Sequence, residues 1–69
     1  MKSLEEIRYT LRNEEWYLEP FQVLSEIANL CSSHIDLGRE FVIRALEHRD
    51  FLSKGHGVIL DKLAIQVGL

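Results

Sequence analysis

The chain has 69 residues and a mass of 8.0 kDa, and 46% of its residues are apolar, 28% charged and 9% aromatic. These fractions are typical of one small globular domain over residues 1–69, and they exclude a disordered tail or a collagen-like repeat. The net charge of -3 lacks the basic excess that dedicated nucleic-acid-binding domains of this size usually carry.

The first predicted helix begins at a capping box. The Ser3 side chain can accept from the backbone N–H of Glu6, and the Glu6 side chain can reach back to the backbone of Ser3. The helix either ends at Asn13 or continues for another turn, up to a limit at Pro20, because the residue before a proline is pushed out of the helical region. The sequence leaves open whether residues 1–18 form one helix or two. The apolar stripe of this segment consists of Leu4, Ile7 and Leu11.

The second helix is predicted over residues 20–31, with Pro20 in its first turn. Its apolar face is broad, which predicts that this helix is the central one of the domain. Residues 32–35 are predicted to form a short break. The apolar face consists of Phe21, Val23, Leu24, Ile27, Ala28, Leu30 and Cys31.

Asp36 is predicted to be the N-cap of a third helix over residues 36–48. Glu40 lies in its first turn, where the helix dipole favours an acid, and Glu40 and Arg44 have the favourable i,i+4 order. The apolar stripe consists of Leu37, Phe41, Val42, Ala45 and Leu46.

Glycines mark the last connection. Asp50 is predicted to cap a short turn at residues 51–53, and the segment Gly55-His56-Gly57 is predicted to be the turn before the next helix. A fourth helix is predicted over residues 58–67, with Gly68 as its stop. The sequence therefore predicts an all-α fold, a compact bundle of four main short helices with an extra helical turn. The apolar residues of the last helix are Ile59, Leu60, Leu63, Ala64 and Val67.

No metal-binding or catalytic constellation is predicted. Cys31 and His34 have a ligand-like spacing, but Cys31 lies on the apolar stripe, where a free cysteine packs as a small hydrophobe. His48 and His56 match no standard ligand spacing. No serine lies in a nucleophile motif, and the glycine-rich segment lacks the order of a P-loop. We therefore expect a protein that is not an enzyme and needs no metal or cofactor.

Helix-turn-helix DNA binding is the alternative function. The helices at 20–31 and 36–48 have roughly the lengths of that motif. Arg39 would lie near the start of the recognition helix, with Arg44 and Arg49 further along. Acidic residues on both sides of Arg39 would face phosphates, so binding to nucleic acid is the weaker interpretation.

Protein–protein interaction is the preferred function, either with a partner or between copies of the chain. A domain of about 60 residues buries only about 60% of its unfolded surface, so a four-helix unit this small leaves apolar residues uncovered. Trp16 and Tyr17, beside the acids Glu14 and Glu15, are predicted to make an apolar contact, although Trp16 could instead close the open end of the core. The apolar residues that fall outside the helix stripes are Trp16, Tyr17, Ile43, Phe51, Leu52 and Ile65.

Charge patterning supports the same interpretation. The net charge of -3 lies entirely within residues 1–35, and the second half of the chain is neutral. Arg39, Arg44 and Arg49 are predicted to make charged contacts with the acidic half of another copy. Such a head-to-tail contact could build a ring or a filament, and we therefore expect a homo-oligomer.

The single cysteine, Cys31, cannot form an internal disulfide, which fits a reducing compartment. No signal peptide is visible, and no apolar run approaches the roughly 18 residues that span a bilayer. We expect a cytoplasmic protein without a membrane partner. No motif identifies a known family, and the chain is either a complete small protein or the N-terminal domain of a longer one.

Overall fold

The computed structural model describes residues 3–13 and 15–69, and this part of the chain contains helices and no strand. The prediction of an all-α bundle with four main helices is confirmed, and two short 3-10 helices join them. Glu14 lies outside the described residues. The elements are α1 (Leu4–Asn13), η1 (Trp16–Leu18), α2 (Phe21–Ser33), α3 (Ile35–Leu46), η2 (Arg49–Phe51) and α4 (Lys54–Gln66).

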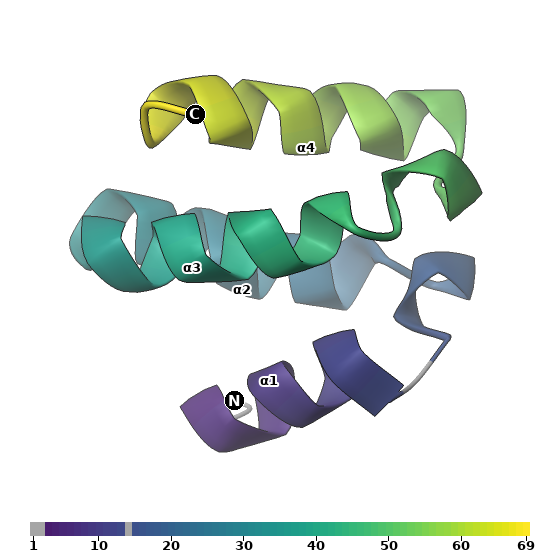
Figure 1. Cartoon of the computed structure of the whole chain (residues 1–69), viewed down its shortest axis with the longest axis horizontal. Helices are drawn as coiled ribbons and strands as arrows, with labels where there is room; N and C mark the ends of the chain where they lie inside the picture. The colour runs from purple at the N-terminus through teal and green to yellow at the C-terminus, as the bar shows by residue number, and fades with distance from the viewer. Residues whose placement is uncertain (1–2, 14) are drawn as a thin grey trace.

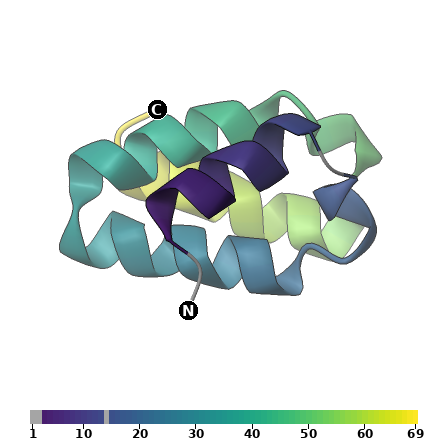
Figure 2. The same cartoon turned by 90° about the horizontal axis from the view of Figure 1, so that it is seen from below.

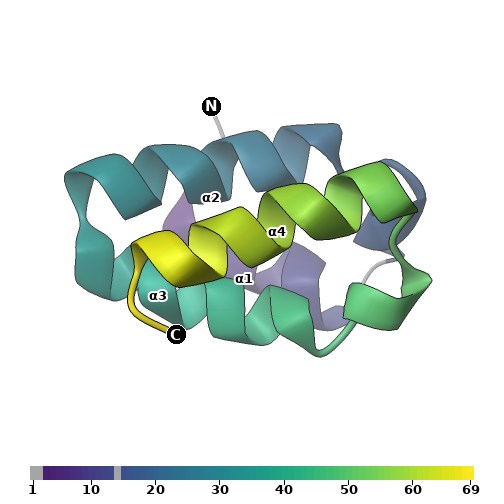
Figure 3. The same cartoon turned by 90° about the horizontal axis from the view of Figure 1, so that it is seen from above.

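The four helices form three layers (Figure 1). Helices α2 and α3 lie side by side in the middle layer, α1 covers one side of this layer and α4 covers the other (Figures 2 and 3). Each outer helix therefore has one side against the core and one side toward solvent. In the described residues, no helix is both long and apolar enough to cross a membrane.

The capping box at the start of α1 is confirmed. The backbone N–H of Glu6 donates to Ser3 Oγ over 3.2 Å, and the backbone N–H of Ser3 donates to Glu6 Oε1 over 3.5 Å. Helix α1 ends at Asn13, and η1 follows as a separate element. The question left open by the sequence is therefore answered: residues before Pro20 form two elements.

The predicted break between the second and third helices is too long. Helix α2 continues to Ser33, whose hydroxyl donates to the Asn29 carbonyl over 2.8 Å and so finds its partner within the helix. Only His34 has non-helical backbone angles, and it occupies the N-cap position of α3. The prediction that Asp36 is the N-cap is therefore wrong, because Asp36 already lies in the first turn.

The prediction of a turn at Gly55-His56-Gly57 is also wrong, because these residues lie inside α4. Ser53 provides the N-cap, and its side chain accepts from the backbone N–H of His56 over 3.3 Å, so α4 begins at Lys54 and includes both Gly55 and Gly57. A polar side chain at the N-cap position stabilises a helix start by about 1 kcal/mol, which accounts for the earlier start.

The segment before Ser53 differs from the prediction in the same way. Helix α3 ends at Leu46 rather than near residue 48, and the short turn forms over Arg49–Phe51 instead of residues 51–53.

The stop at Gly68 is confirmed. Gly68 has a φ of 83°, its N–H donates to the Ile65 carbonyl, and the next N–H donates to the Ala64 carbonyl. This is the Schellman pattern of a helix C-terminus.

The core lies between the three layers and receives side chains from all four helices and from η1. Leu4, Phe21 and Ile59 were placed on apolar stripes by their spacing, but all three are exposed. Phe21 and Ile59 stay exposed because α2 and α4 leave an open groove between them, which both residues line. The buried apolar residues are Ile7, Leu11, Trp16, Val23, Leu24, Ile27, Cys31, Phe41, Val42, Ala45, Leu60, Leu63 and Val67.

Gly38 brings the two middle helices into close contact. A Cβ atom at this position would lie 2.7 Å from both Cα and N of Cys31 and 2.9 Å from its Sγ. These distances are far below ordinary van der Waals contact, so only glycine fits. Gly38 therefore sets the spacing between α2 and α3.

We predict that Gly38→Ala destabilises the domain by about 1–3 kcal/mol, because the added methyl group forces two helix backbones apart. Gly55→Ala is the matched control, since a Cβ there meets nothing within 4 Å and alanine is a better helix former. Urea unfolding followed by circular dichroism would measure both variants. Equal stability of Gly38→Ala and the wild type would contradict the role given to Gly38.

Candidate interaction surface

Four ring side chains bring η1 and η2 together. The ring of Tyr17 stacks on Phe51 with centroids 4.9 Å apart and on His48 at 5.6 Å. Trp16 meets His48 edge-on, with centroids 5.9 Å apart. These four residues form the aromatic cluster, which lies where α1 and α3 end and where α2 and α4 begin (Figure 2).

The cluster runs from the core to the surface. Trp16 is only 4% exposed and belongs to the core, Tyr17 is half-buried and Phe51 is 63% exposed. Trp16 Nε1 and His48 Nδ1 are both buried, and neither has a hydrogen-bond partner within the described residues. Ring contacts rather than hydrogen bonds therefore hold the cluster. Trp16 takes the position at the end of the core, and Tyr17 carries the accessible part of the predicted pair.

Two further apolar side chains are exposed at the same end of the bundle. Leu18 is 68% exposed and Phe21 is 77% exposed. We call the surface formed by Tyr17, Leu18, Phe21 and Phe51 the aromatic end. The sequence showed Phe51 only as an apolar residue outside every stripe. The helical spacing of Phe21 pointed to the core, and no sequence signal marked Leu18.

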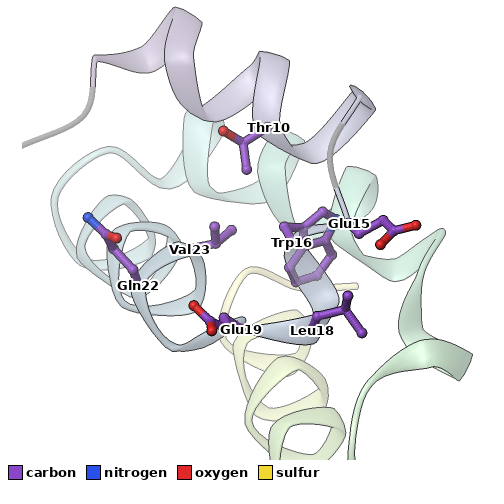
Figure 4. A pocket seen from close by; sticks show the side chains of 7 residues that line it. All are labelled: Thr10, Glu15, Trp16, Leu18, Glu19, Gln22 and Val23. Atoms are coloured by element: carbon purple, nitrogen blue, oxygen red, sulfur yellow. The ribbon is translucent and has the colours of Figure 1, made fainter.

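An open hollow of about 390 Å³ lies beside the aromatic end, between α1, η1 and the start of α2 (Figure 4). Its floor includes the Trp16 ring and Val23, and the carboxylates of Glu15 and Glu19 stand at its edge. Both carboxylates are exposed, so this end of the molecule combines apolar side chains with negative charge.

The predicted Arg44 contact is made within the chain. Glu40 of α3 accepts from Arg8 of α1 over 3.0 Å and from Arg44 over 3.1 Å, and Arg8 also pairs with Glu5 at 2.6 Å. The hydrogen bond from Arg8 lowers the pKa of Glu40 below its ordinary value. This network fastens α1 to α3.

Arg49 is held in a similar way. Its guanidinium donates to both carboxylate oxygens of Asp61 on α4, over 3.1 Å and 2.7 Å. It also lies against Gly57, where a Cβ atom would be 3.2 Å from its Nη1. The hydrogen bond from Arg49 lowers the pKa of Asp61. Arg39 is different: it is exposed and makes no ion pair with the part of the chain that is described. The structure thus places the three predicted arginines at three separate sites.

The soft metal ligands are dispersed. Cys31 is buried beneath Gly38, and burial raises the pKa of its thiol, whereas His34 is exposed at the opposite end of the bundle from His48. Within residues 3–13 and 15–69, no group of three histidine, cysteine, aspartate or glutamate side chains could hold a metal ion.

The sequence model of one protein family, described as the anti-bacteriophage protein B N-terminal domain, matches residues 1–69. The chain therefore belongs to this family. No curated protein and no solved structure matches the chain.

We predict that Glu40→Gln reduces the loss of stability in acid. Because the folded-state pKa of Glu40 is lowered, its contribution is present above the ordinary value of 4.5 and is lost as the pH falls through the lower folded value. Urea midpoints at about pH 7 and about pH 3 would therefore differ less in this variant than in the wild type. Glu47→Gln, an exposed control at the C-cap of α3, should keep the full difference between the two midpoints. A full difference in Glu40→Gln would refute the prediction.

Proposed function

We propose that this member of the anti-bacteriophage protein B N-terminal domain family is a non-enzymatic interaction module that acts in defence against bacteriophage. Its aromatic end binds a protein partner or another copy of the chain. One observation carries this proposal: Leu18, Phe21 and Phe51 are 63–77% exposed at one end of the bundle. Exposed apolar side chains gathered at one place are typical of protein interaction sites.

The energetics favour a contact at this end. Fully burying a leucine or phenylalanine side chain contributes about 1.5–3 kcal/mol, so three such residues supply much of a binding free energy. The Phe51 ring is already held against Tyr17 by stacking at 4.9 Å, which lowers the entropy lost on binding. Aromatic residues with this kind of support are frequent hot spots at interfaces.

Charge indicates the character of the partner. Glu15 and Glu19 flank η1, Asp50 lies in η2, and all three are exposed. A partner surface with basic residues around an apolar centre would complement this end. Association should therefore weaken as salt screens these charges.

The nearest approach to a catalytic pair does not support an enzyme. Ser53 Oγ lies 2.8 Å from His56 Nδ1, but the same oxygen accepts the backbone N–H of His56 as the N-cap of α4. An activated serine needs a histidine that a third residue orients, and within the described residues no third side chain is hydrogen-bonded to this ring. The pair is explained by helix capping.

Helix-turn-helix binding to DNA has less support than protein binding. A single residue, His34, separates α2 from α3, whereas the motif uses a turn of about 3–4 residues. Arg44 is engaged by Glu40, which leaves Arg39 as the exposed base of α3.

A cytoplasmic location is part of the proposal, because Cys31 is a free thiol.

We predict that Phe51→Ser and Leu18→Ser abolish association while leaving the fold intact, because both side chains are exposed. The first readout is the solution mass against concentration, at low and high salt. The second is phage resistance of bacteria that express the full protein. Ile35→Ser, an exposed control at the other end of α3, should match the wild type in both. Trp16→Ala is unsuitable, since removing a core tryptophan costs about 3–5 kcal/mol.

A mass above 8.0 kDa that falls with salt and in both variants would identify another copy as the partner. A monomer whose phage resistance is lost in both variants would identify a different protein. Unchanged mass and unchanged resistance would refute the proposal. Salt-dependent binding of the wild type to duplex DNA, weakened by Arg39→Ala, would replace it with the DNA-binding alternative.

A further inference from the structure

We propose that the solvent side of α4 is a second docking site and that it takes an acidic amphipathic helix of a partner protein. This surface, the α4 outer face, lies on the far side of α4 from the core (Figure 3). It consists of Lys54, Val58, Ile59, Lys62 and Ile65, all of them exposed.

Helix α4 is apolar on both sides. Leu60 and Leu63 are buried on the side that packs against α2 and α3, while Val58, Ile59 and Ile65 face solvent, and Ile65 is 74% exposed. A helix on the surface of a bundle normally has a polar outer side, and a helix that is apolar all round is normally covered. The apolar outer side of α4 therefore fits a position beneath another element.

The other outer helix provides the contrast. The outward side of α1 carries Glu5, Glu6 and Arg12 around one exposed aromatic residue, Tyr9. Helix α1 thus has the polar surface expected of an outer layer, and α4 does not. The apolar face of α4 is a property of that helix and not of small bundles in general.

The spacing on α4 fits a helical partner. Val58, Lys62 and Ile65 follow one another at intervals of four and three residues, which is the alternation of core positions in a coiled coil. This row runs along the helix axis and is flanked by Ile59. At its edge, Phe21 and Ile59 line the α2–α4 groove, an apolar hollow of about 130 Å³ that could receive a large side chain of the partner.

Charge decides which helix fits. Lys54 and Lys62 are the charged residues of the α4 outer face, and neither makes an ion pair within residues 3–13 and 15–69. The carboxylate of the neighbouring acid, Asp61, already accepts hydrogen bonds from Nε and Nη2 of Arg49. The face is therefore positive in a chain of net charge -3. A lysine at a core position of a helix pair is complemented by a glutamate on the partner.

A second copy is a poorer occupant of this face. In a two-fold dimer the same patch lies on both sides of the interface, so two faces of the same positive charge would meet without an acid to neutralise them. An acidic helix buries the same apolar row and neutralises both charges. Phe21 lies at the edge of both this site and the aromatic end. The other residues of the two surfaces lie on different elements, α4 for this site and η1 and η2 for the aromatic end, so the two together would let the domain bridge two partners.

The test uses two synthetic helical peptides of about 20 residues, long enough to span α4. Both have leucine at i, i+3, i+4 and i+7; the flanking positions are glutamate in one peptide and lysine in the other. Fluorescence anisotropy would measure their binding to the wild-type domain at low salt. We expect the glutamate peptide to bind and the lysine peptide to bind at least about tenfold more weakly, a difference that corresponds to one or two charge pairs.

Variants locate the site. Lys62→Glu should weaken binding of the glutamate peptide about tenfold and strengthen binding of the lysine peptide. Ile65→Ser should weaken binding of both peptides. Phe51→Ser and Ile35→Ser are matched exposed controls and should change neither, which also separates this site from the aromatic end. Circular dichroism would show that each variant is folded.

Four outcomes would overturn the proposal. They are equal binding of the two peptides, binding that Lys62→Glu and Ile65→Ser leave unchanged, no binding of either peptide, and self-association that Ile65→Ser abolishes. The last outcome would assign the α4 outer face to another copy of the chain. The first three results do not bear on Phe51→Ser, so the function proposed for the aromatic end stands or fails separately. The fourth is distinguished by the solution mass, which Phe51→Ser lowers only when the aromatic end makes the contact between copies.

Discussion

Gly38 lets the backbones of α2 and α3 touch at Cys31, since any side chain at position 38 would meet Cys31 backbone atoms at 2.7 Å. Two helices this close, joined by His34 alone, make a flat middle layer with two apolar sides. Helices α1 and α4 can only pack on opposite sides of that layer (Figure 1). The three-layer arrangement, and with it the position of every surface described above, therefore depends on having glycine at position 38.

The charged residues then fasten the outer layers to the middle of the bundle. Arg8 joins α1 to Glu40 on α3, and Arg49 joins η2 to Asp61 on α4. Partly exposed ion pairs of this kind contribute little to stability, but they set which charges remain free for a partner. Two of the three arginines that the sequence predicts as contacts, Arg44 and Arg49, are paired within the chain and remain partly exposed. The exposed charges without an ion pair in the described part of the chain include acids near the aromatic end, Arg39 on α3 and two lysines on α4.

This separation of charge gives the domain two unlike surfaces. The aromatic end joins exposed rings to carboxylates, and the α4 outer face joins branched apolar side chains to ammonium groups. Surfaces of opposite charge discriminate between partners, because each repels the ligand that suits the other. The proposed interaction role needs such discrimination, and a chain of this size can provide it only on its surface, since its interior is filled by the core.

The sequence by itself determined what depends on residues close together in the chain: the helical class, the capping box of Ser3 and Glu6, the end of α1 at or beyond Asn13, and the stop at Gly68. Only the tertiary structure decided which apolar faces are covered. It buried Trp16, exposed Phe21 and Ile59 along a groove, and placed Gly57 in a helix beneath Arg49. Local hydrogen bonds act within about four residues, so spacing reveals them. Burial depends on side chains from distant elements, which periodicity alone cannot place.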